Sequence, residues 1–111
     1  YTQAVIQDKP NYHINIVMDV SPYCDCYSAP DVAIIPNVGM FASADPVALD
    51  CACADACNKM PSLPNSLLTD EHNDIEDHFT HIAPTTNWKD TMTHAEKIGV
   101  GSMKYELITI K

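Results

Sequence analysis

The sequence predicts an α/β fold in which helices pack on a small, mostly parallel sheet, and it indicates the C-terminal part of a larger fold. Apolar, β-branched runs come before the main helical segment, and one more follows the last helical segment. Strands that alternate with helices in this way are typical of a parallel sheet covered by helices. A sheet of three or four strands is thin, so we expect its edge to be covered by further chain or by another protein.

The first strand is predicted over residues 12–20, which are rich in β-branched and aromatic side chains and nearly continuously apolar after Ile14. Residues 32–35 predict a short edge strand that Pro36 ends, and residues 38–42 predict a second buried strand. Continuous apolar runs are typical of strands that are covered on both faces. We therefore expect the apolar side chains of the two buried strands to be shielded from water. These include Ile14, Ile16 and Val38.

The main helix is predicted over residues 46–59. Asp45 precedes it as the N-cap, because its carboxylate can accept hydrogen bonds from the first amides, and Pro46 suits the first helical position. Asn58 and Pro61 mark the end of this helix.

The rest of the chain is predicted to hold two more helices and a last strand. Residues 60–86 form a long polar segment in which residues 74–81 predict one short helix. A further helix is predicted over residues 87–98, ended by Gly99 in the left-handed conformation. Residues 105–110 then predict the last strand.

The composition predicts one acidic, soluble unit. A chain of 111 residues is long enough for one core, so residues 1–111 are expected to be a single α/β domain or a fragment of a larger one. Six Lys and no Arg against fifteen Asp and Glu give a net charge of -9, which would repel nucleic acids and anionic membrane surfaces. No apolar run approaches the roughly 20 residues that span a bilayer. We expect neither nucleic acid nor membrane as a partner.

The five cysteines are an odd number in two closely spaced clusters, which is poor geometry for a disulfide framework. They indicate a reducing compartment, and we expect a cytoplasmic protein. Cys53 and Cys57 lie four residues apart on one face of the main predicted helix, where packing in the core explains them. Cys51 lies on a different stripe of that helix and is expected to be exposed.

The Cys24-Asp25-Cys26 loop is the candidate site. Its two thiolates can face one centre, with sulfurs within about 4 Å of each other, and Asp25 can add an oxygen ligand. Thiolates suit zinc or an iron–sulfur cluster, each of which takes four ligands. Asp19, His13 or residues upstream of this sequence would complete the set. The alternative interpretation is that the two cysteines only fill a loop beside the sheet.

Three other features are weaker candidates. Asp50 could present a carboxylate near the start of the main helix, although a cap or a surface charge explains it better. The acidic segment with His72, His78 and His81 could hold zinc or nickel, although a solvated loop is the more common outcome. Residues 99–102 close a helix and open a strand, so they predict a turn rather than a phosphate-binding loop.

Four motifs, taken together in this order, resemble one known family. They are Met18-Asp19-Val20-Ser21-Pro22 leading into Cys24-Asp25-Cys26, Val38-Gly39-Met40-Phe41-Ala42-Ser43, Asp45-Pro46-Val47-Ala48-Leu49-Asp50, and Ala95-Glu96-Lys97-Ile98-Gly99-Val100-Gly101-Ser102 before Tyr105-Glu106-Leu107. From about Tyr12 to Ile110 the chain resembles the C-terminal portion of the domain-of-unknown-function 362 proteins, described as uncharacterised iron–sulfur centre proteins.

The resemblance implies a partner and a site. Longer members carry an upstream ferredoxin-type segment with cysteine-rich cluster motifs, so the expected partner of these residues is such a segment or another chain. Cys24 and Cys26 match the Cys-Asp-Cys element of the family. The resemblance implies that Cys51, Cys53 and Cys57 are particular to this chain, because the corresponding helix in relatives more often has other residues at these positions.

These observations lead to three hypotheses. The first is a metal or iron–sulfur associated module of redox role, whose ligands are Cys24, Cys26, Asp25 and Asp19. The second is an enzyme domain in which Asp19, Asp25 and Asp50 line a pocket at the strand ends, where ligands gather in open α/β sheets. The third is a structural half-domain without chemistry of its own. The sequence identifies neither a catalytic residue nor a substrate.

Overall fold

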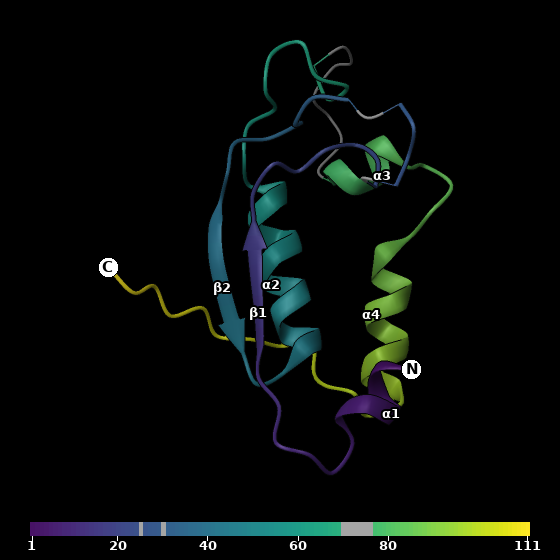
Figure 1. Cartoon of the computed structure of the whole chain (residues 1–111), viewed down its shortest axis with the longest axis vertical. Helices are drawn as coiled ribbons and strands as arrows, with labels where there is room; N and C mark the ends of the chain where they lie inside the picture. The colour runs from purple at the N-terminus through teal and green to yellow at the C-terminus, as the bar shows by residue number, and fades with distance from the viewer. Residues whose placement is uncertain (25, 30, 70–76) are drawn as a thin grey trace.

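A computed structural model describes residues 1–24, 26–29, 31–69 and 77–111. The elements, in chain order, are α1 (Thr2–Ile6), β1 (His13–Val17), β2 (Gly39–Ser43), α2 (Pro46–Asn58), α3 (His78–Ile82) and α4 (Trp88–Lys97). The two strands lie side by side against α2, and α4 lies on the far side of α2 from the sheet (Figure 1). The α/β fold class is confirmed.

The sheet is antiparallel, so the prediction of a mostly parallel sheet is wrong. β1 pairs with β2 in a register that places Asn15 opposite Phe41 and Val17 opposite Gly39. Parallel neighbours need a crossover connection, usually a helix. The link between the two strands contains no helix in its described residues, and the chain simply turns back on itself. The direction of the second strand therefore follows from a loop whose path the local sequence does not specify.

Two predicted strands are not strands. Ile34 and Ile35 lie in a loop at the end of the sheet, 4% and 2% exposed, and Ile34 is held there by backbone hydrogen bonds to Val20 and Leu63. Their apolar character reflects burial in the core rather than pairing in a sheet. Residues 105–110 run past the strands as an extended tail without strand pairing (Figure 1). Leu107, Ile108 and Ile110 of this tail are exposed.

α2 begins at Pro46, after Asp45 as its N-cap, as the sequence predicts. The Asp45 side chain accepts hydrogen bonds from the amides of Val47 at 2.9 Å and Ala48 at 3.0 Å, and Pro46 occupies the first turn. A carboxylate at this position satisfies two amides that have no partner within the helix. The helix ends at Asn58, with Lys59 as the C-cap, which agrees with the expected boundary.

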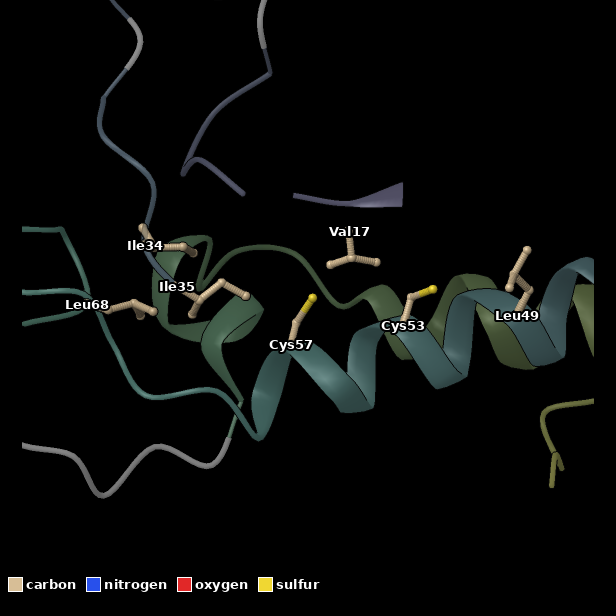
Figure 2. Close-up of a cluster of buried hydrophobic side chains, with 7 residues drawn as sticks. All are labelled: Val17, Ile34, Ile35, Leu49, Cys53, Cys57 and Leu68. Carbon is tan, nitrogen blue, oxygen red and sulfur yellow. The ribbon is translucent and has the colours of Figure 1, made fainter. Parts of the chain in front are cut away.

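The core lies between α2, the sheet and the loops at one end of the sheet (Figure 2). Figure 2 shows the sulfurs of Cys53 and Cys57 on the side of α2 that faces Val17 of β1, as their spacing predicted. Cys51 is only 5% exposed, so the prediction of an exposed Cys51 is wrong. Because α2 packs against the sheet on one side and α4 on another, most of its circumference is buried.

The outer face of the sheet is exposed, which contradicts the prediction that both faces are covered. Ile14, Ile16 and Met40 are 58%, 65% and 71% exposed, whereas Val17 is buried and Val38 half-buried. Successive side chains of a strand point to opposite faces. Residues 13, 15 and 17 therefore face α2, and the alternate residues face away from it. No described segment covers that outer face.

The last two helices follow the sequence signals. α4 begins after Asn87, whose side chain accepts a hydrogen bond from the Lys89 amide, and Gly99 follows it with a φ of 82°. A positive φ favours glycine at this position, as the predicted left-handed cap requires. Of the short helix predicted over residues 74–81, residues 74–76 lie outside the described residues, and α3 begins at His78, after Asp77 as its cap. Among the described residues, no helix is long and apolar enough to cross a bilayer.

Candidate functional site

The loop after β1 brings two thiols together at the surface. Cys26 Sγ donates a hydrogen bond to Cys24 Sγ at 3.0 Å, and both residues are exposed. The amide of Tyr27 donates to the carbonyl of Cys24 at 2.9 Å, which closes a turn around the pair. The Tyr23 and Tyr27 rings, with centroids 4.9 Å apart, pack against each other across the base of the turn. The two sulfurs therefore lie within the separation expected for ligands of one centre.

The core anchors the base of this loop. Val20 packs against the buried cluster, and its carbonyl accepts a hydrogen bond from the Ile34 amide at 2.8 Å. Ser21 Oγ donates to the carbonyl of Tyr23 at 2.8 Å, which stabilises the chain just before the first cysteine. The base of the loop therefore contacts the core, and its two thiols are exposed.

Two of the other predicted ligands, Asp19 and His13, have described hydrogen-bond partners other than the thiols. Asp25 lies outside the described residues. The backbone amide of Asp19 donates to Asn37 Oδ1 at 2.8 Å, and His13 Nε2 makes a 2.8 Å hydrogen bond with Asn11 Oδ1. In the described ranges, no three His, Cys, Asp or Glu side chains gather in a way that could hold a metal ion.

The carboxylates of the enzyme hypothesis serve different parts of the fold. Asp50 is exposed on α2, where it accepts a hydrogen bond from Asn15 Nδ2 at 2.9 Å. Asn15 lies in the middle of β1, whereas Asp19 follows the end of that strand and has a φ of 49°. No described contact joins Asp50 to Asp19. Asp25, the third carboxylate of this hypothesis, lies outside the described residues.

The three cysteines of α2 have a different environment from the loop pair. Cys51, Cys53 and Cys57 are 5%, 8% and 5% exposed. Burial is the main cause that raises the pKa of each thiol, and the nearby Asp55 raises that of Cys51 further. A raised pKa leaves little thiolate at neutral pH, and the thiolate is the form that binds metals and attacks disulfides. These residues are core side chains.

The acidic histidine segment falls mostly outside the described residues. Residues 70–76, which include His72, belong to the parts that the structure does not describe. His78 Nε2 makes a 2.9 Å hydrogen bond with the carbonyl of Met60, and its amide donates to Asn58 Oδ1. His78 therefore connects α3 to the end of α2, which is a structural role.

Sequence reasoning missed a second role of Asp45. Besides capping α2 with Oδ1, its Oδ2 accepts a hydrogen bond from the amide of Ser102 at 2.8 Å. A Cβ atom on Gly101 would clash with the same carboxylate, so only glycine allows this approach. The predicted turn at residues 99–102 is thus the partner of the helix start. The repeated occurrence of glycine in Gly99-Val100-Gly101 was the signal that could have indicated a close backbone approach.

A second missed contact joins α2 to the tail. The Tyr105 hydroxyl donates to Asp55 Oδ2 at 2.5 Å. This hydrogen bond to a carboxylate is the main cause that raises the pKa of Tyr105 to about 12. The contact fixes the beginning of the tail, and the apolar residues after it remain exposed.

The comparison with protein families covers the N-terminal part of the chain. The model of a domain of unknown function, DUF362, matches residues 1–55. Over those residues the chain belongs to the DUF362 family. The DUF362 match contains β1, the Cys24 and Cys26 loop, β2 and the start of α2, so the candidate site lies in the family region. The motif at residues 95–107 lies outside the match. No curated protein and no solved structure matches the chain.

Proposed function

We propose that this DUF362 chain is a metal or iron–sulfur associated module of redox role, in which Cys24 and Cys26 supply two thiolate ligands. The observation that carries the proposal is the 3.0 Å separation of the two sulfurs on an exposed, anchored turn. The remaining ligands come from Asp25, from a ferredoxin-type segment upstream, or from a partner chain. The metal is zinc or the iron of an iron–sulfur cluster.

The spacing of the sulfurs suits this role. Thiolates bound at about 2.3 Å to one tetrahedral ion lie about 3.8 Å apart. The observed pair lies closer, at 3.0 Å, with a hydrogen bond from Cys26 Sγ to Cys24 Sγ. Deprotonation removes that hydrogen bond, and a small side-chain rotation then opens the pair to the ligand separation. No movement of the core is needed, since the turn projects from it.

Two thiolates alone do not satisfy zinc or a cluster, both of which take four ligands. The exposure of the pair leaves the outer side of the site accessible to ligands from elsewhere. A site shared between two segments is consistent with a scaffold that supplies half of the ligands. Binding would then join this module to the segment that supplies the other half.

The test is the metal content of the protein purified with its full native sequence under anaerobic conditions. Zinc, iron and acid-labile sulfide are measured per chain for the wild type, for the Cys24→Ser/Cys26→Ser variant, and for Cys53→Ala as the matched control. We expect the double variant to lose most of the bound metal and Cys53→Ala to retain it. Metal content that survives the double substitution would mean that the loop is a structural element only.

A further inference from the structure

We propose that Cys24 and Cys26 also form a reversible dithiol–disulfide couple, whose exchange partner is an accessible disulfide of a low-molecular-weight thiol. The couple requires only the two sulfurs of the loop. Its existence therefore does not depend on metal binding, although its effect on metal loading rests on the proposed function above.

The geometry of the turn is close to that of a disulfide. A disulfide bond is about 2.05 Å long, so sulfurs at 3.0 Å must approach by about 1 Å to form it. The hydrogen bond from the Tyr27 amide to the Cys24 carbonyl, at 2.9 Å, links the two ends of the segment that carries both cysteines. The ring contact between Tyr23 and Tyr27 restrains the chain on either side of the pair. Closure is therefore a local change.

The number of sulfurs in the loop also favours disulfide formation. A metal site needs four ligands, so two sulfurs alone do not complete it. A disulfide needs two sulfurs and nothing else, and the loop holds both. The pair is complete for thiol–disulfide exchange as it stands.

The five cysteines differ in access to a reagent. Cys24 and Cys26 are exposed, whereas Cys51, Cys53 and Cys57 are buried along α2. Burial raises the pKa of all three helix thiols, which lowers their thiolate fraction. Exchange proceeds through attack by a thiolate on an accessible sulfur. The fold therefore restricts exchange to the loop pair and protects the other thiols.

The exchange balances in two steps. A thiolate of the pair attacks one sulfur of the reagent disulfide, whose sulfur–sulfur bond breaks, and the first reagent thiolate leaves. The second loop thiol loses its proton and attacks the protein sulfur of the mixed disulfide, which expels the second reagent thiolate. The two protons from the loop thiols end on the two reagent thiolates. The loop is oxidised by two electrons, and the reagent is reduced to two thiols.

The oxidised and metal-bound states exclude each other. A disulfide has no thiolate to donate to zinc or iron, and a thiolate bound to a metal is a poorer nucleophile toward a disulfide. If the pair ligates a metal, oxidation of the loop releases it and reduction restores the site. The loop would then adjust metal loading to the thiol–disulfide balance around it.

The couple is tested on the full chain after metal removal with a chelator. The protein is equilibrated anaerobically with mixtures of reduced and oxidised glutathione, quenched, alkylated under denaturing conditions, and analysed by intact and peptide mass spectrometry. We expect a monomer that loses two alkylatable thiols, with Cys24 linked to Cys26, and recovers both on reduction. Cys26→Ser should stop at one glutathione adduct on Cys24, and Cys53→Ala should behave as the wild type.

Three results would overturn the inference. In the first, the wild-type protein stops at mixed disulfides with glutathione. In the second, it forms only disulfide-linked dimers. In the third, its helix cysteines are oxidised before the loop cysteines. Metal content is measured separately on reduced protein. Disulfide formation without metal binding refutes the proposed function alone, and metal binding without disulfide formation refutes the couple alone.

Discussion

Removal of the Asp45 carboxylate should destabilise the protein by more than an ordinary helix cap does. Oδ1 accepts hydrogen bonds from the amides of Val47 and Ala48, and Oδ2 accepts one from the amide of Ser102. Loss of a cap costs about 1 kcal/mol. A hydrogen bond from an amide to a charged group adds about 1.5 kcal/mol when the site is partly buried, as here. We therefore expect Asp45→Ala to lower the free energy of unfolding by about 2–3 kcal/mol.

The assay is urea unfolding followed by far-ultraviolet circular dichroism, with Asp50→Ala as the matched control. Asp50 lies on the same helix, is exposed, and accepts one hydrogen bond, from Asn15. Its replacement should cost about 0.5 kcal/mol, as is usual at exposed positions. Gly101→Ala, which places a Cβ against the Asp45 carboxylate, should destabilise the same junction. Equal losses for Asp45→Ala and Asp50→Ala would refute the triple hydrogen-bonding role of Asp45.

Two further predictions concern the sheet and the tail. Val17→Ala should lower the free energy of unfolding by about 1–3 kcal/mol, since it leaves a void in the core, whereas Ile16→Ala on the exposed face should change it by under about 0.5 kcal/mol. Equal effects in urea unfolding would contradict the assigned faces. Tyr105 should ionise with a pKa near 12 in an ultraviolet titration, and Asp55→Asn should lower that value toward 10. Because the folded pKa is raised, the contribution of this contact to stability is complete below about pH 10 and is lost as the pH rises toward 12. An unshifted Tyr105 in the wild type would show that the contact is absent in solution.

Helix boundaries could be predicted from the sequence because they depend on neighbouring residues. Asp45 followed by Pro46 defines the start of α2, and Gly99 defines the region where α4 ends. These signals act within one turn of helix, so the helix boundaries that they define do not depend on distant parts of the chain. The positions of Cys53 and Cys57 in the core followed from helical periodicity in the same way.

The sheet could not be predicted to the same extent because its arrangement depends on distant contacts. The run at Ile34 and Ile35 is equally compatible with a strand and with a buried loop, and only its contacts with Val20 and Leu63 decide between them. The exposure of the outer face of the sheet also depends on distant parts of the chain. Ile14 and Ile16 are apolar as if covered, and the described chain has no segment that covers them.

The candidate site was predictable in part. The spacing of Cys24 and Cys26 was sufficient to predict that a turn could bring their sulfurs together, and the turn does so. The identity of further ligands was not predictable, because thiol spacing carries no information about groups that arrive from elsewhere in the sequence or from another chain. The ligand roles of Asp25 and Asp19 therefore remain predictions.

X-ray absorption at the metal edge tests the central claim most directly, because it counts the sulfur atoms bound to the metal. The measurement compares anaerobically purified wild type with Cys24→Ser/Cys26→Ser and with Cys53→Ala. We predict sulfur ligands at about 2.3 Å in the wild type and in Cys53→Ala, with two sulfurs fewer, or no metal at all, in the double variant. A wild type without bound metal, or a sulfur shell that is unchanged in the double variant, would contradict the assignment of the Cys24 and Cys26 loop as a metal site.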